Sequence, residues 1–261
     1  MRGYWSAQFV ARWAPYMTVG SAMRVRRAFS LDVDCAQTVS VVLRPPIGRR
    51  VQIRVPSSDL GAIGEVMRQK VYSPIKKHVK KARAVLDLGA NIGIATNYFA
   101  SIYPNAQIIA VEPHPETFEL LVENTRHANF RGLVTPVHAA VWHEAGSLKL
   151  TTPESGAYVA ATVVERSYDG DCVAEGIEVP AVRVQDLLAK LDGGQADIVK
   201  MDVEGAEAVL LSSSNDWIDS VRCLAVEFHA DSREASGFDA LMKEKGLRVY
   251  EYPHTVLGVR E

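Results

Sequence analysis

A glycine-rich turn and two carboxylates form the pattern in this sequence that most clearly implies chemistry. The segment AVLDLGANIG (84–93) contains the spacing D-x-G-x-N-x-G. The later segment IIAVEP (108–113) ends in an E-P pair, and a histidine follows it. A carboxylate before such a turn would repel a pyrophosphate but could attract a cationic amino-acid group. A carboxylate at the next strand end can accept both hydroxyls of a ribose. These features fit S-adenosylmethionine, and the residues concerned are Asp87, Gly89, Asn91, Gly93, Glu112 and Pro113.

The turn lacks the usual fingerprint of dinucleotide-binding proteins. That fingerprint, G-x-G-x-x-G, places a pyrophosphate at a helix N-terminus, whereas no glycine lies between Gly89 and Gly93. Glu112 alone would fit a nicotinamide dinucleotide as well, because those proteins place the same carboxylate on the ribose. A nicotinamide-dependent dehydrogenase therefore stays as an alternative, and preferential binding of NADH would identify it.

A second group of acidic residues, with one histidine, lies in DIVKMDVEGAE and AVEFHAD. Methyl transfer to oxygen needs the acceptor aligned with the methyl group and a base for the hydroxyl proton. We expect Asp202 near the methyl donor and either Glu204 or His229 as the general base, since histidine titrates near neutral pH. Glu207 is expected to favour a helix N-terminus rather than to take part in catalysis.

The same residues raise the question of a metal ion. Asp202 with Glu227 or His229 could supply part of an octahedral site for a divalent cation, which would bind and acidify the acceptor hydroxyls. Their spacing is not specific enough to predict such a site. A metal requirement therefore stays open.

Apolar strands and amphipathic helices alternate from residue 84 onward, which indicates a parallel sheet with helices on both faces. Only Pro253 and His254 separate the last two strands, so these two must run antiparallel. We therefore expect a Rossmann-like α/β fold with a seven-stranded, mostly parallel sheet and an antiparallel last strand. A β-rich insertion is expected at 146–182. The expected strands are 84–88, 107–112, 133–138, 197–202, 222–228, 247–252 and 255–260, and the expected helices are 92–101, 115–128, 205–213 and 233–245.

The charge distribution divides the chain at the glycine-rich turn. Of 261 residues, 48% are hydrophobic and 23% charged, and the net charge is −2. Residues 1–83 hold 16 Lys and Arg against 4 Asp and Glu, so their net charge is +12 and that of 84–261 is −14. We expect a basic N-terminal extension at 1–83, with a β-hairpin around PPIG, that caps the substrate or contacts another subunit. Residues 84–261 are expected to form the domain that binds the cofactor.

The first segment of the extension, YWSAQFVARWAPY, places four aromatic residues on one helical stripe. Such a stripe most commonly docks on the rest of the protein or on a second subunit of a homo-oligomer. Because arginines lie nearby, peripheral contact with a membrane stays as an alternative. Three scattered cysteines and the lack of an apolar run long enough to span a bilayer lead us to expect a cytoplasmic protein. The aromatic residues are Trp5, Phe9, Trp13 and Tyr16.

Several ordered motifs together resemble the FkbM family of S-adenosylmethionine-dependent methyltransferases. They are DLGANIGIATNYFA, IIAVEPHPETFELLVENTRHAN, PVHAAVW and DIVKMDVEGAEAVLL, which cover about 84–228. The resemblance implies the fold of class I methyltransferases and methyl transfer to a hydroxyl group of a macrolide-type polyketide, a sugar or a glycan. It also implies that the D-x-E-G and E-x-H elements belong to the active site.

The resemblance also implies positions for the parts of the cofactor. The turn from Asp87 to Gly93 would hold the amino-acid portion, and Glu112 would hold the ribose. Ala139 and Ala140, just past the third strand, would lie near the adenine. No role is assigned to His114, His127, His138, His143 and His254.

Two further alternatives remain. A methyltransferase acting on nucleic acid is disfavoured, because the position of the usual N/D-P-P-Y element reads D-V-E-G and no cysteine follows a proline. A scaffold protein that binds the cofactor without turnover is disfavoured because the chemically active residues are all present. Binding of S-adenosylmethionine without methyl transfer to any hydroxylated compound would identify the scaffold.

Overall fold

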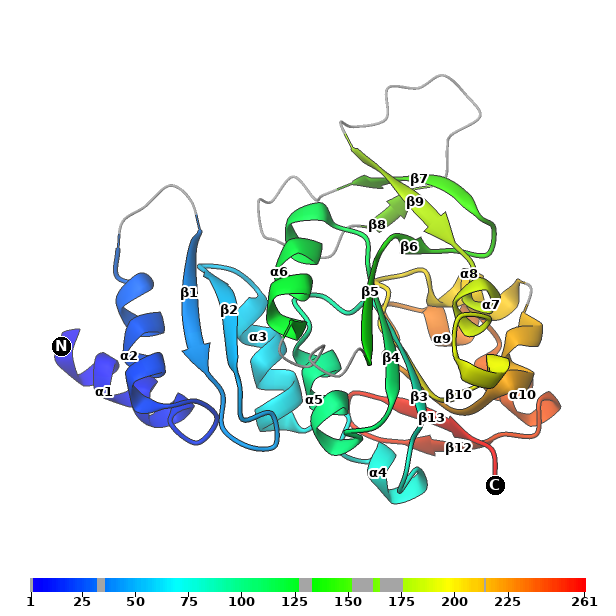
Figure 1. Cartoon of the computed structure of the whole chain (residues 1–261), viewed down its shortest axis with the longest axis horizontal. Coiled ribbons are helices and arrows are strands. Elements are labelled where there is room, and N and C mark those ends of the chain that lie inside the picture. Colours follow the sequence, from blue (N-terminus) through cyan, green and yellow to red (C-terminus); the bar gives the residue numbers. More distant parts are fainter. Residues whose placement is uncertain (1, 32–35, 127–132, 152–161, 165–175, 214) are drawn as a thin grey trace.

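The computed structural model of the chain describes residues 2–31, 36–126, 133–151, 162–164, 176–213 and 215–261. Its centre is a seven-stranded sheet with the strand order β12-β13-β11-β10-β3-β4-β5 (Figure 1). Every neighbouring pair is parallel except the two that involve β13. The strands are β3 (Ala84–Leu88), β4 (Gln107–Glu112), β5 (Val134–His138), β10 (Ala196–Met201), β11 (Val221–Val226), β12 (Arg248–Glu251) and β13 (Val256–Val259).

This topology confirms the expected seven-stranded sheet and its antiparallel last strand. Helices connect the parallel strands because a parallel pair needs a crossover connection. One expected helix, at 233–245, is instead two helices, since Gly237 adopts a left-handed φ of 61° and ends the first of them. The connecting helices are α5 (Ile94–Ile102), α6 (Pro115–Thr125), α7 (Val184–Leu188), α8 (Glu207–Ser212), α9 (Ser232–Ala235) and α10 (Phe238–Glu244).

The central strands are buried on both faces. All five residues of β3 are buried, as is usual for strands covered by helices on each side. Alternate side chains enter different cores, with Val85 and Ile198 on one face and Leu86 and Val199 on the other. The middle of the sheet is therefore packed on both faces, and the carboxyl ends of β3, β4, β10 and β11 present the polar residues described below.

The N-terminal extension packs against one face of this sheet. Its hairpin pairs β1 (Gln37–Val42) with β2 (Arg50–Val55) in antiparallel register, as the sequence predicted. Buried residues of the extension, including Ile53 and Ile63, share one core cluster with Phe99 of α5 and Ile198 of β10. The helical elements of the extension are α1 (Arg2–Trp13), α2 (Val19–Ala28), α3 (Asp59–Ile63), the π-helix η1 (Gly64–Gln69) and α4 (Ile75–His78).

The aromatic stripe of α1 docks within the extension. Phe9 lies 6.4 Å from Trp13, and Trp13 lies 6.2 Å from Tyr16, measured between ring centroids. Trp13 is buried, whereas the side chain of Trp5 lies outside the described residues. No helix in the described part of the chain is both long and apolar enough to cross a membrane.

The expected β-rich insertion forms a second, small sheet with the order β6-β9-β7-β8. Figure 1 shows it above the end of the central sheet that carries β5. Of the three cysteines, Cys223 is a buried free thiol, and Cys35 and Cys172 lie outside the described residues. The strands of the small sheet are β6 (Ala140–Val141), β7 (Gly146–Thr151), β8 (Thr162–Val164) and β9 (Ile177–Val182).

Candidate active site

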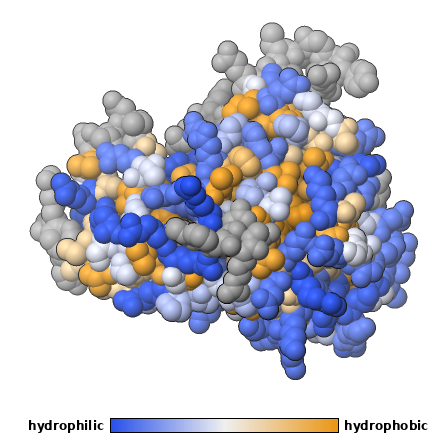
Figure 2. Space-filling view, viewed as in Figure 1, coloured by the Kyte–Doolittle hydropathy of each residue, from blue (hydrophilic) through white to orange (hydrophobic). Residues whose placement is uncertain are grey.

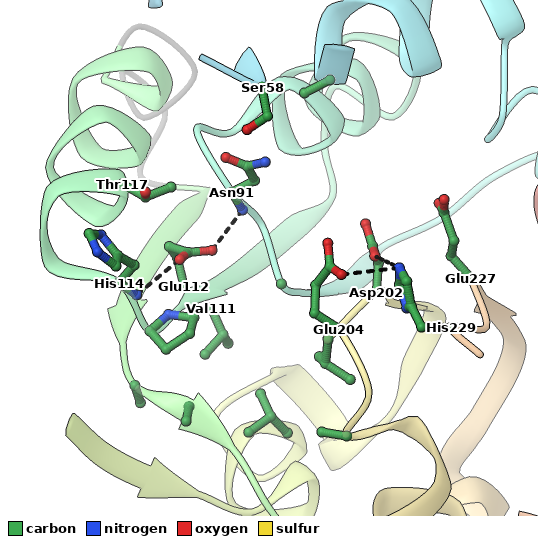
Figure 3. Close-up of a pocket in the computed structure, with 18 of the residues that line it drawn as sticks. Ser58, Asn91, Val111, Glu112, His114, Thr117, Asp202, Glu204, Glu227 and His229 are labelled. Carbon is green, nitrogen blue, oxygen red and sulfur yellow. Dashed lines mark hydrogen bonds and ion pairs between the residues drawn. The ribbon is translucent and has the colours of Figure 1, made fainter. Parts of the chain in front are cut away.

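A pocket of about 310 Å³ opens at the carboxyl ends of the central strands, where ligands bind in open α/β sheets. The loops after β3, β4, β10 and β11 line it, together with residues 139–141 and part of the N-terminal extension (Figure 3). Most of the residues that the sequence singled out lie on this one pocket. Those that line it are Gly89, Asn91, Glu112, Pro113, Ala139, Ala140, Asp202, Glu204, Glu227 and His229.

The glycine-rich turn is shaped by a close approach between two strand ends. A Cβ atom on Gly89 would lie 1.8 Å from the backbone oxygen of Asp202, so no other residue fits there. Gly89, Asn91 and Gly93 all have positive φ values, of 72°, 50° and 83°. Asn91 tolerates this conformation because its Oδ1 accepts the backbone N–H of Ile92. The turn thus exposes backbone at the pocket floor.

Glu112 ends β4 with its carboxylate directed into the same pocket. Its Oε2 accepts the backbone N–H of Asn91 at 3.0 Å, and its Oε1 accepts the backbone N–H of His114 at 2.9 Å (Figure 3). Each carboxylate oxygen keeps a second lone pair for another donor. Burial raises the pKa of Glu112 to about 7. The two hydroxyls of a ribose would supply the donors that this carboxylate can still accept.

An apolar wall and one histidine continue the pocket beyond Glu112. Ala139, Ala140 and Val141 form the wall, which suits a flat aromatic ring such as adenine. His114, to which the sequence assigned no role, also lines the pocket. Burial lowers the pKa of its imidazole, and its Nδ1 is buried without a hydrogen-bond partner among the described residues. A ligand with a polar edge would satisfy that nitrogen.

Asp87 and Gly93 lie behind the pocket surface rather than on it. Asp87 is fully buried, and its Oδ2 accepts the hydroxyl of Thr96 at 2.6 Å. Its Oδ1 lies 3.2 Å from the Nζ of Lys200. The carboxylate that we expected to face a cationic ligand therefore has a cation of the protein beside it.

Lys200 carries a buried ammonium group that we did not predict from the sequence. Besides Asp87, its Nζ lies 3.4 Å from Oδ2 of Asp202 and donates to the backbone oxygens of Leu88 and Gly89. Burial alone would lower the pKa of Lys200, but the acidic groups around it, Tyr72 and the two aspartates, raise it well above the ordinary value. The K-x-D spacing was the available signal, since residues two apart on a strand share one face.

The predicted catalytic residues meet at the other end of the pocket. The Nε2 of His229 lies 3.4 Å from Oε2 of Glu204 and 3.7 Å from Oδ1 of Asp202 (Figure 3). Glu204 reaches this position with a left-handed φ of 51°, in a loop between β10 and α8. Figure 3 shows Glu227 on the side of His229 opposite Glu204, and Glu227 also lines the pocket.

Glu207 holds the imidazole from behind. It is fully buried, and its Oε1 lies 2.9 Å from Nδ1 of His229. The same carboxylate accepts the backbone N–H groups of Val203 and Gly205. The expected role at the start of a helix is therefore combined with a direct contact to His229, which sequence spacing alone could not show.

The charges in this half of the pocket shift each other's titration. The hydrogen bond that His229 donates to the carboxylate of Glu207 is the largest cause that raises the pKa of His229, to about 9. Burial raises the pKa of Glu227 to about 7, and it also raises the pKa of Glu204 and of Glu65. The imidazole is therefore protonated at neutral pH in the ligand-free protein, and the site as a whole has an excess of acidic groups.

Three of these residues have the geometry to hold a metal ion. The ligand atoms of Asp202, Glu204 and His229 all lie within 4.8 Å of one another, and the three side chains are half-buried. Glu207 would keep Nε2 of the imidazole directed at such an ion. Lys200 already lies beside Asp202 and competes for the same carboxylate.

The N-terminal extension supplies the side of the pocket that faces the sheet. Arg54, Ser58, Ala62 and Glu65 line it. Asp59 holds Arg54 in place, with Nη2 of Arg54 2.8 Å from Oδ1 of Asp59. The sequence offered no reason to place these residues in the pocket. Of the other histidines, His78, His138, His143 and His254 do not line the pocket, and His127 lies outside the described residues.

Comparison with protein families matches residues 87–249 to the methyltransferase FkbM domain. The 31-O-demethyl-FK506 methyltransferase FkbM of Streptomyces tacrolimicus is 25% identical over 211 residues. The match covers 71% of this chain and 80% of that protein. The hexuronic acid methyltransferase AglP of Haloferax volcanii is 26% identical over 168 residues, 62% of each chain.

Methyltransferase sdnD of Sordaria araneosa is 28% identical over 191 residues, which is 63% of this chain and 73% of that protein. Among solved structures, a methyltransferase FkbM from Methylobacillus flagellatus superposes with a TM-score of 0.48 at 14% identity. That alignment covers 73% of this chain and 49% of the other. The strand order of the central sheet, and not this likeness, establishes the fold.

Proposed function

Because the chain belongs to the FkbM methyltransferase family, we propose that it transfers the methyl group of S-adenosylmethionine to a hydroxyl oxygen of a sugar, glycan or polyketide-type acceptor. One observation carries this proposal. A single pocket has a ribose-binding carboxylate at one end, Glu112, and a carboxylate-supported imidazole at the other, His229. The first suits the donor, and the second suits the acceptor proton.

The residues of the donor half fit S-adenosylmethionine. Glu112 can accept the ribose hydroxyls, and the turn at Gly89 and Asn91 exposes backbone beside it. His114 and the wall at 139–141 suit the adenine, because they offer one unsatisfied polar nitrogen and an apolar surface. When bound, the cofactor supplies a methyl group on a positively charged sulfur. The acidic excess of the site favours such a positive charge.

The acceptor half provides for loss of a proton from the hydroxyl. Glu207 fixes the imidazole by its Nδ1, so Nε2 is the nitrogen that faces the pocket. His229 accepts the proton on Nε2 once it is in its neutral form, and Glu204 and Asp202 stabilise the imidazolium that results. This division of roles, with Glu207 orienting the base, follows the general pattern of a histidine held by a buried carboxylate.

Acceptor choice lies with the N-terminal extension in this proposal. Glu65 and Ala62 of the extension line the pocket, and Glu65 is coupled by charge to Asp202 and His229. The extension is thus a substrate cap rather than an added independent domain. The relatives that act on a hexuronic acid and on an FK506 derivative support a hydroxylated small molecule or sugar as the acceptor.

Binding and turnover test this function separately. Calorimetry is expected to show binding of S-adenosylmethionine by the wild type, and labelled methyl transfer is expected with a panel of sugars, uronic acids and macrolides. His229→Ala should bind the cofactor nearly as well as the wild type and lose turnover, since His229 lies at the acceptor end. Cofactor binding without transfer to any acceptor would instead indicate a scaffold, and tighter binding of NADH would refute the assignment of the cofactor.

A further inference from the structure

Most of the exposed apolar side chains lie close together in the sequence, in the first part of the N-terminal extension and before the first pocket residue, Arg54. Six large hydrophobic side chains are exposed among the described residues, and four of them lie between residues 19 and 31. Met23 is the most exposed of these, at 59%. The four residues, which we term the α2 patch, are Val19, Met23, Phe29 and Leu31.

Two of these residues, Val19 and Met23, lie on the outer face of the amphipathic helix α2, and Phe29 and Leu31 follow its last residue. Ser21, Ala22, Val25 and Ala28 form the buried face of α2, which packs on the hairpin strand β1. Met23 lies one turn from Val19 on the opposite face. Figure 1 shows α1 and α2 at the end of the molecule, with the hairpin between them and the rest of the chain. Phe29 is partly covered, because its ring lies 6.1 Å from the ring of Phe9 in α1, measured between centroids, whereas Met23 stays 59% exposed.

Arginine is the predominant charged residue around the patch. Residues 1–31 contain five arginines and no acidic residue, and Asp32 and Asp34, which follow in the sequence, lie outside the described residues. Three of the arginines, Arg24, Arg26 and Arg27, belong to α2 itself, and no described carboxylate lies within ion-pair distance of any of them. Figure 2 shows hydrophobic and hydrophilic residues side by side at this end of the molecule. Apolar side chains among unpaired cations are complementary to a surface of anionic headgroups above acyl chains.

We propose that the α2 patch docks the protein on an anionic lipid bilayer, with Met23 and its apolar neighbours in the headgroup region and the arginines of α2 on the phosphates. This differs from a membrane contact through the aromatic stripe of α1. Phe9 and Trp13 of that stripe contact one another, and Trp13 is buried, so those rings already have partners within the protein. The docking face does not include any residue that lines the pocket.

Sedimentation of the full chain with vesicles tests the proposal. Wild-type protein is expected to pellet with phosphatidylcholine vesicles that contain about 30% phosphatidylglycerol and to remain in solution with phosphatidylcholine alone, because the arginines need anionic headgroups. Raising the salt to roughly 0.5 M should release it. Wild-type protein that stays in solution with the anionic vesicles at low salt overturns the proposal.

Two variants locate the contact. Met23→Glu should weaken vesicle binding at least about tenfold, because an apolar side chain no longer enters the headgroup region and a negative charge replaces it. Val122→Glu is the matched control, since Val122 is an exposed apolar residue, at 42%, on α6 outside the patch, and it should bind like the wild type. Binding by Met23→Glu equal to wild type overturns the proposal, as does equal loss in both variants.

A protein partner for the same face would give a different result. If wild-type protein forms a dimer in sedimentation equilibrium without lipid and Met23→Glu is monomeric, the patch is a contact between copies of this chain, and the lipid proposal fails. The thermal unfolding midpoint and S-adenosylhomocysteine binding of each variant serve as controls for folding. Both should match the wild type, because the patch lies outside the pocket.

Discussion

The carboxylate of Glu207 lies 2.9 Å from Nδ1 of His229, and the glutamate is fully buried while the imidazole is partly open to the pocket. This pair links the start of α8 to the loop after β11. It raises the pKa of His229 to about 9 and leaves Nε2 as the nitrogen that faces ligands. The pair therefore controls both the direction and the protonation of the proposed base.

The first prediction concerns the pH dependence of turnover. A base must be neutral before it accepts a proton, so activity should rise with pH as His229 titrates. Glu207→Gln keeps a hydrogen-bond acceptor for Nδ1 but removes the charge, so the pKa of His229 falls and the midpoint of the pH profile moves to lower pH. Kinetics from about pH 6 to 10 measure this shift. If Glu207 only supported the fold, activity would fall without any movement of the midpoint.

The second prediction concerns the charge of the cofactor. S-adenosylmethionine and S-adenosylhomocysteine differ by one methyl group and the positive charge on sulfur. A nearby positive charge disfavours the protonated imidazole. The pKa of His229 should therefore fall further when S-adenosylmethionine is bound than when S-adenosylhomocysteine is bound. Titration of the imidazole by NMR, with His229→Gln to assign the signal, measures both values. Equal values would place the sulfur away from His229.

The sequence predicted the framework well, for a physical reason. Strand and helix periodicity, together with the short link at Pro253 and His254, determine the order and direction of the strands with few alternatives. The contacts of Glu207 and Lys200 were missed because they depend on which side chains meet across different strands and helices. Lys200 reads as an ordinary residue of a strand until the register of β10 with β3 brings it beside Asp87.

The third prediction concerns Glu112. Glu112→Gln places an N–H group where the carboxylate now accepts backbone N–H groups from Asn91 and His114, and it removes acceptors from the ribose. Affinity for S-adenosylhomocysteine should fall about tenfold or more, in line with roughly 1.5–3 kcal/mol for a hydrogen bond to a charged group. Calorimetry checks this, with Glu119→Gln, an exposed glutamate on α6, as the unchanged control.

The pH dependence of wild-type binding follows from the same residue. The pKa of Glu112 is raised to about 7, so the carboxylate form that accepts the ribose hydroxyls is lost as the pH falls below that value. Affinity should therefore decrease from about pH 8 to pH 6, and the Glu112→Gln variant should not show this decrease. A pH-independent wild-type affinity would contradict the role of Glu112.

The fourth prediction tests the metal question. The carboxylate of Asp202 already has Lys200 at 3.4 Å, and His229 holds a proton at neutral pH. The ammonium of Lys200 and the proton on His229 therefore occupy the carboxylate and the imidazole nitrogen that would bind a divalent ion. Turnover should therefore be unchanged after removal of metals with a chelator and should not rise on addition of magnesium. Loss of activity in the chelator, restored by magnesium, would instead establish a site at Asp202, Glu204 and His229.

The fifth prediction separates the structural role of Asp87 from a direct contact with the cofactor. Asp87→Ala leaves the buried ammonium of Lys200 without one of its carboxylates, which should cost about 3–5 kcal/mol of unfolding free energy and abolish cofactor binding. The double variant Asp87→Ala/Lys200→Met removes both charges together, so it should be more stable than Asp87→Ala alone. Denaturant unfolding measures the stability of the four proteins in this cycle, which are the wild type, Asp87→Ala, Lys200→Met and the double variant. Cofactor binding restored in the double variant would show that Asp87 acts through Lys200, whereas binding that stays lost in a folded double variant would assign a direct role to Asp87.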